Sequence, residues 1–100
     1  MEYIQYPGAL KELDKFKDKK VYMIVDKRSY DNFDNVNNFE IELFNGECSL
    51  KEIERISLYI NDFDVVIGFG GGKILDAAKA VAFFNKKYLI IIPTSASNDG

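Results

Sequence analysis

A glycine-rich segment carries the clearest chemical signal in this 100-residue sequence. Residues 68–73 read Gly-Phe-Gly-Gly-Gly-Lys and stand between the apolar run 65–67 and a helical pattern. Glycines let a ligand approach the backbone amides closely, and the first turn of a helix offers free N–H groups to a phosphate. The segment is not a P-loop, because position 74 is not Ser or Thr, and not a strict G-x-G-x-x-G, because position 73 is Lys. Phosphate or pyrophosphate binding is the favoured interpretation, and a tight turn needed only for packing is the alternative.

Polar side chains also follow two other apolar runs. Asp26 follows the run 21–25, where an acid can accept hydrogen bonds from both ribose hydroxyls of an adenosine and repel a 2′-phosphate. A solvated turn residue or a helix cap is an equally good interpretation of Asp26. After the last apolar run, residues 94–99 read Thr-Ser-Ala-Ser-Asn-Asp, which could contact phosphate or amide groups, while Asp99 could hold a substrate hydroxyl. Taken without any family resemblance, these residues are better interpreted as a plain polar loop.

The residue types that are absent limit the chemistry. The chain has no histidine, which excludes a Ser-His or Cys-His dyad and an imidazole base within it. Its own residues are therefore expected to supply binding and not a full catalytic apparatus. The single cysteine, Cys48, excludes an internal disulfide, fits a reducing cytoplasm, and is expected to pack as a small apolar residue.

Charge and hydropathy exclude further classes of function. The net charge of −3, from 13 basic and 16 acidic residues, leaves no basic field for nucleic acid. The apolar runs fall far short of the roughly 20 residues that span a bilayer, so no membrane insertion is expected. The start of the chain lacks the layout of a signal peptide. With 47% apolar residues, the chain can form one compact domain.

Continuous apolar runs typical of buried strands alternate along the chain with helical patterns, which predicts an α/β fold around a mainly parallel sheet. Helices are expected near 8–17 and 72–84, and a third after Ser49, whose S-x-x-E spacing to Glu52 is that of a capping box. The apolar face of this third helix is expected to consist of Leu50, Ile53, Ile56 and Ile60. Ligands of such sheets bind beyond the carboxyl ends of the strands, so the sequence is expected to stop inside its own site. Strands are expected at 21–25, 39–44, 65–67 and 89–92.

Three parts of the sequence resemble one superfamily. FNGECS at 44–49, continued by EIER at 52–55, resembles the second strand and helix of glycerol dehydrogenases, and GFGGGKILDAAK at 68–79 resembles their cofactor loop. PTSASNDG at 93–100 resembles the loop that follows, with an ending closer to that of sn-glycerol-1-phosphate dehydrogenases. Both groups belong to the iron-containing alcohol dehydrogenase and dehydroquinate synthase-like superfamily.

The resemblance implies that residues 1–100 form an N-terminal NAD-binding domain, Rossmann-like with helices on both faces of the sheet and incomplete. It implies a dehydrogenase that transfers hydride between NAD and glycerol or a glycerol-like polyol, homo-oligomeric when full length and cytoplasmic. Zinc or iron would be held by an Asp and by His residues of a second, helical domain, so this chain would supply neither metal ligands nor catalytic residues. The resemblance also assigns individual residues. Asp26 would bind the adenosine ribose and Asp99 would contact the polyol. The pyrophosphate would be bound by Gly70, Gly71, Gly72 and Lys73, and the nicotinamide side of the cofactor would be lined by Thr94, Ser95 and Ser97.

Three alternatives stay open from the sequence. The first is a substrate choice, glycerol 1-phosphate in place of glycerol. The second is a lyase of the dehydroquinate synthase type, whose loop usually ends in Val-Asp-Ser where this chain has Ser-Asn-Asp-Gly at 97–100. The third is a nucleotide-binding module without chemistry, which the absence of metal ligands would support.

Overall fold

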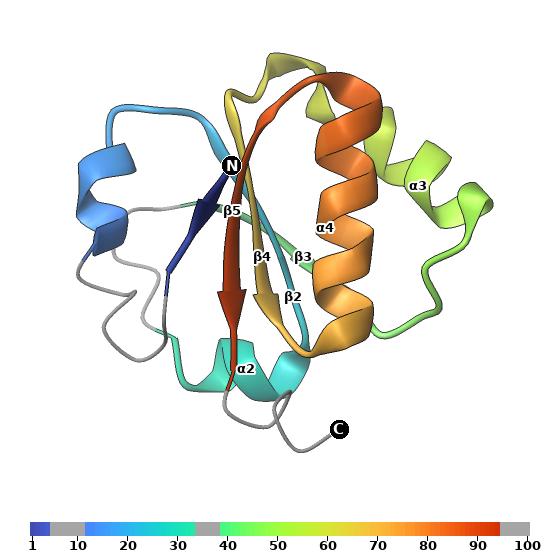
Figure 1. The fold of residues 1–100 in the computed structure, drawn as a ribbon, viewed down its shortest axis with the longest axis horizontal. Coiled ribbons are helices and arrows are strands. Elements are labelled where there is room, and N and C mark those ends of the chain that lie inside the picture. Colours follow the sequence, from blue (N-terminus) through green and yellow to red (C-terminus); the bar gives the residue numbers. More distant parts are fainter. Residues whose placement is uncertain (5–11, 34–38, 95–100) are drawn as a thin grey trace.

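The computed structural model describes residues 1–4, 12–33 and 39–94, which form a five-stranded sheet with helices around it (Figure 1). Every pair of neighbouring strands is parallel, and the strand order is β1-β5-β4-β2-β3. The elements are β1 (Glu2–Tyr3), the 3-10 helix η1 (Leu13–Phe16), β2 (Val21–Val25), α2 (Lys27–Asp31), β3 (Glu40–Leu43), α3 (Leu50–Ser57), the 3-10 helix η2 (Ile60–Asp62), β4 (Val65–Gly70), α4 (Gly72–Asn85) and β5 (Tyr88–Pro93).

Both faces of the sheet are covered, which confirms the predicted α/β architecture. Successive side chains of a strand point to opposite faces, and β2 shows the consequence. Tyr22 and Ile24 join a core cluster with α3 and α4, whereas Met23 and Val25 join a second cluster with Leu13 of η1. Figure 1 shows α3 and α4 together on one side of the sheet and η1 on the other. Strands buried on both faces account for the continuous apolar runs of the sequence.

The carboxyl ends of the strands meet at one edge of the sheet, where α2 and α4 begin (Figure 1). The register places Val25 of β2 beside both Phe69 of β4 and Leu43 of β3, and Gly70 of β4 beside Pro93 of β5. Residues that follow these positions therefore share this edge. Asp26 and Gly71 lie 45 residues apart in sequence and become neighbours because β2 and β4 are adjacent.

The described helices agree with the sequence patterns in part. Ser49 caps α3, since its Oγ accepts a hydrogen bond from the backbone N–H of Glu52 at 3.2 Å. The helix expected at 8–17 is described from residue 12, with a short 3-10 helix at Leu13–Phe16, and its earlier part lies outside the described residues. None of the described helices has the length and apolar content needed to cross a bilayer.

Four details of the structure differ from the sequence analysis. The sequence patterns did not predict β1 or α2. Leu50, expected on the apolar face of α3, is 64% exposed because it lies in the first turn, at the edge of the core. Cys48 is exposed and does not pack as a small apolar residue, because it lies in the loop before α3 that follows the end of the sheet.

Candidate functional site

The glycine segment connects β4 to α4 at the carboxyl edge of the sheet. Two of its glycines are required by packing and backbone conformation. A Cβ on Gly68 would lie 2.5 Å from the Cβ of Ala78, so this glycine allows α4 to approach the sheet closely. Gly70 has a φ of +152°, which L side chains rarely adopt. Packing and backbone conformation therefore account for these two glycines, and the pyrophosphate role of Gly70 stays a prediction.

The other two glycines face open space. A Cβ on Gly71 or Gly72 would meet no heavy atom within 4 Å. Gly71 is the N-cap of α4, and no side chain accepts a hydrogen bond there. The first turn of a helix has N–H groups without intrahelical partners and carries the positive end of the helix dipole. This half of the segment can therefore receive an anionic group against its backbone.

Asp26 performs a structural role at the start of α2. Its Oδ1 accepts a hydrogen bond from the backbone N–H of Ser29 at 2.7 Å, which makes Asp26 the N-cap. Its Oδ2 lies on the side of the glycine segment, 2.7 Å from the place that a Cβ on Gly70 would occupy. The cap interpretation is confirmed, and it leaves the second carboxylate oxygen facing the glycines.

One cavity of about 300 Å³ brings Asp26 and the glycine segment together. Its walls come from the ends of β2 and β3 and from the start of α4. The lining residues are Asp26, Phe44, Asn45, Gly46, Gly71, Gly72, Lys73 and Ile74. Asn45 and Gly46 were not among the predicted site residues. Their position after a strand was the signal that could have placed them here, because carboxyl ends of parallel strands share one edge.

Lys73 forms an ion pair with a residue that was not among the predicted site residues. Its Nζ lies 2.7 Å from Oε1 of Glu47, which stands in the loop between β3 and α3. Both side chains are exposed, at 68% for Lys73 and 76% for Glu47. The ion pair joins the loop after β3 to the first turn of α4 at the rim of the cavity.

The remaining predicted site residues lie at the end of β5 or beyond it. The backbone N–H of Thr94 donates to the carbonyl oxygen of Gly70 at 3.2 Å, so Thr94 stands beside the glycine segment without lining the cavity. Ser95, Ser97 and Asp99 lie outside the described residues. The described part of the site thus contains Asp26, the glycines, Lys73 and Thr94.

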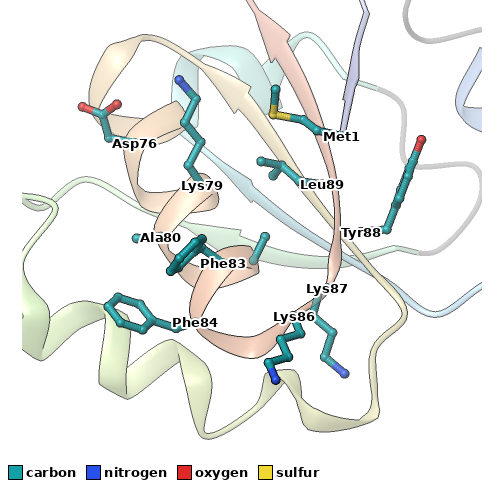
Figure 2. A pocket seen from close by; sticks show the side chains of 11 residues that line it. Met1, Asp76, Lys79, Ala80, Phe83, Phe84, Lys86, Lys87, Tyr88 and Leu89 are labelled. Atoms are coloured by element: carbon teal, nitrogen blue, oxygen red, sulfur yellow. The ribbon is translucent and has the colours of Figure 1, made fainter.

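A larger cavity, of about 980 Å³, lies elsewhere on the molecule (Figure 2). It is formed by the outer side of α4 and the start of β5, and its walls include the exposed rings of Phe83 and Phe84. Asp76 and Lys79 of α4 line this cavity and not the one at the glycine segment. None of the predicted site residues within the described part of the chain lines it.

A network of ion pairs and hydrogen bonds connects α3 to β3. Arg55 donates to Glu42 and Glu52, each at 3.0 Å, and Tyr22 donates to Glu42 at 2.7 Å. Hydrogen bonding from Arg55 lowers the pKa of Glu52, whereas burial and the Glu42 hydrogen bond raise the pKa of Tyr22. The contacts that cause these pKa shifts stabilise the charged form of Glu52 and the neutral form of Tyr22. Both residues therefore suit a structural role.

The fold and the site together define a parallel α/β domain with a glycine-rich loop between a central strand and a helix. The profile described as iron-containing alcohol dehydrogenase matches residues 2–100. The chain belongs to this family.

Individual relatives agree with this assignment. A glycerol dehydrogenase of Thermotoga maritima is 43% identical over 110 residues, which cover 97% of this chain and 30% of the relative. A glycerol-1-phosphate dehydrogenase (NAD(P)+) of Methanococcus maripaludis is 43% identical over 58 residues, covering 58% of this chain and 17% of the relative. The crystal structure of a probable glycerol dehydrogenase from Sinorhizobium meliloti superposes with a TM-score of 0.72 at 30% identity, over 92% of this chain and 28% of that one. The chain thus spans less than a third of the length of these relatives.

Proposed function

We propose that residues 1–100 are the N-terminal, NAD-binding domain of a metal-dependent oxidoreductase that transfers hydride between NAD and glycerol or a glycerol-like polyol. One observation carries the proposal: Asp26 and the open glycines line the same cavity at the carboxyl edge of a parallel sheet. In such sheets the pyrophosphate of a dinucleotide sits at a helix N-terminus, and a carboxylate at the end of a neighbouring strand takes the ribose hydroxyls.

The residues of the cavity fit this part of NAD. Gly71 and Gly72 leave room for a phosphate against the first turn of α4, and Lys73 supplies a positive charge at the rim. Asp26 is held by its hydrogen bond to Ser29, so its Oδ2 is positioned to accept from a ribose hydroxyl. A cavity of about 300 Å³ is at the small end of ligand pockets, so we assign it to the ribose and pyrophosphate. When bound, NAD supplies the hydride acceptor, C4 of its nicotinamide.

The nicotinamide and the polyol are assigned to the end of β5. Thr94 stands beside Gly70, and Ser95 and Ser97 follow it in the sequence. We propose that these three residues line the nicotinamide side of the cofactor and that Asp99 accepts hydrogen bonds from the polyol. The described position of Thr94, next to the glycine segment, supports this arrangement.

The described residues do not fit a metal centre. No group of three or more His, Cys, Asp or Glu side chains within them could hold an ion, and the sequence has no histidine. The proposal therefore places the ligands of the zinc or iron outside this chain. The proposal also includes a cytoplasmic location, which the single cysteine supports, and no nucleic-acid partner, which the net charge of −3 supports. It further includes no membrane insertion and a homo-oligomer for the full-length enzyme, the latter from the family resemblance.

A second substrate, glycerol 1-phosphate, has one observation in its favour. The Methanococcus relative, named for that substrate, is as identical to this chain as the glycerol dehydrogenase of Thermotoga, although over fewer residues.

Calorimetric titration of the intact protein with NAD tests the first part of the proposal, and a protein that does not bind NAD would contradict it. Initial rates of NAD reduction with glycerol and with glycerol 1-phosphate then decide between the substrates, and we expect glycerol to be oxidised faster.

A further inference from the structure

We infer that the carboxylate of Glu47 forms an ion pair with Lys73 while no nucleotide is bound. When a nucleotide binds, its pyrophosphate takes the place of this carboxylate as the partner of the lysine ammonium. Glu47 would thereby set the affinity of the site for anionic nucleotides. The inference rests on the proposed function and adds a residue that regulates the same site.

The geometry of the rim supports this exchange. Glu47 lies in the loop between β3 and α3, whereas Lys73 lies 26 residues later in the first turn of α4, yet Oε1 and Nζ lie 2.7 Å from each other. Lys73 lines the cavity, as does Gly46, which directly precedes Glu47. The carboxylate therefore holds the lysine ammonium at the edge of the space assigned to the pyrophosphate.

The exposure of the pair makes the exchange possible at little cost. An ion pair between two solvent-exposed side chains contributes little net stability and is screened by salt. Here both partners are more than two-thirds exposed. A pyrophosphate carries two negative charges and would also receive the N–H groups of the first turn of α4, which Glu47 does not contact in the described structure. These backbone N–H groups give the pyrophosphate hydrogen bonds in addition to the one from Lys73, so the anion should displace the carboxylate.

Two other roles of Glu47 predict different results. If Glu47 positions Lys73 for the cofactor, its removal should weaken nucleotide binding. If Glu47 repels phosphate through its charge alone, its removal should strengthen binding whether or not Lys73 is present. If Glu47 and the pyrophosphate compete for Lys73, removal of the Glu47 charge strengthens nucleotide binding only in a protein that still contains Lys73.

The test is calorimetric titration of the intact protein with NAD and with ADP. The variants are Glu47→Gln, Lys73→Gln and the double variant; the control is Glu54→Gln, which removes the same charge from an exposed position of α3 that does not line the cavity. We expect Glu47→Gln to bind both nucleotides about two- to fivefold more tightly, as the loss of an exposed ion pair allows. The gain should disappear in the Lys73→Gln background and shrink at high salt.

Three outcomes would overturn the inference. Weaker or unchanged binding by Glu47→Gln would exclude competition for Lys73. An equal gain in the Lys73→Gln background would indicate simple repulsion, and an equal gain in Glu54→Gln would indicate an effect of net charge. A failure of the unmodified protein to bind NAD would instead contradict the proposed function, so the two failures are distinguishable.

Discussion

The carboxylate of Asp26 lies directly against the backbone of Gly70. A Cβ on Gly70 would come within 2.7 Å of Asp26 Oδ2 and 3.0 Å of Ile74 Cγ1, and the φ of this glycine is +152°. The end of β2 and the end of β4 can approach this closely only because Gly70 has no side chain. One contact thus joins the two segments that carry the proposed ribose and pyrophosphate sites.

Gly70→Ala should destabilise the protein by about 1–3 kcal/mol, because the substitution adds a strained backbone conformation to a steric clash. Urea unfolding followed by circular dichroism measures the change. Gly72→Ala is the matched control, since its Cβ would meet nothing within 4 Å and alanine is a better helix former. That control should be neutral or stabilising by up to about 1 kcal/mol, and equal losses at both positions would contradict the explanation.

Gly71→Val should abolish NAD binding while the fold is retained. The branched side chain would enter the open space next to the first turn of α4, where we place the pyrophosphate. Loss of a glycine N-cap should cost only about 1 kcal/mol. Calorimetry with NAD, with circular dichroism as the test of folding, checks this expectation. Gly71→Ser is the control with a small, cap-competent side chain and should keep measurable affinity. If the valine variant binds NAD normally, the open glycines serve only the turn.

Asp26 should make the protein prefer NAD over NADP by at least about tenfold, or about 1.4 kcal/mol, because its charge would repel a 2′-phosphate. Asp26→Asn should narrow this difference. Asparagine can still cap α2, so the hydrogen bond to Ser29 is preserved and a change in cofactor preference reflects the charge. Dissociation constants for both cofactors, measured on both proteins, provide the comparison. Equal affinities in the unmodified protein would remove the basis for this role.

Acid should destabilise the protein partly through Glu52. Arg55 lowers the pKa of Glu52 in the folded state, so the pair contributes stability above the ordinary pKa of a glutamate, about 4.3. This contribution is lost as pH falls through the lower, folded-state pKa. Arg55→Met should therefore flatten the dependence of unfolding free energy on pH below about 4. Urea titrations at several pH values measure this slope, and Arg28→Met, on an exposed residue of α2, should leave it unchanged.

Asp99→Ala should lower kcat/KM for the polyol by about 10²-fold, equivalent to about 2.7 kcal/mol of lost transition-state stabilisation. NAD affinity should stay nearly the same, because we assign Asp99 to the substrate and not to the cofactor. Steady-state kinetics and an NAD titration on the intact protein separate the two effects. Asn98→Ala serves as the neighbouring control. Unchanged kinetics would make Asp99 an ordinary loop residue.

Local patterns in the sequence predicted much of the described fold. The apolar runs at 21–25 and 89–92 became β2 and β5, and the helical pattern after the glycines became α4. The spacing of Ser49 and Glu52 predicted the cap of α3. These features are visible in sequence because burial and helix capping depend on residues only a few positions apart. The helix α2 was missed because it is only five residues long and carries no apolar stripe.

The sequence by itself determined the fold class, the family resemblance and the segments that could bind a nucleotide. Only the tertiary structure decided that Gly68 and Gly70 serve packing while Gly71 and Gly72 stay open, and that Glu47 pairs with Lys73. The physical reason is the strand order. Placing β2 beside β4, with β3 beyond it, brings together residues that lie 26 to 45 positions apart, and no local periodicity encodes such a pairing.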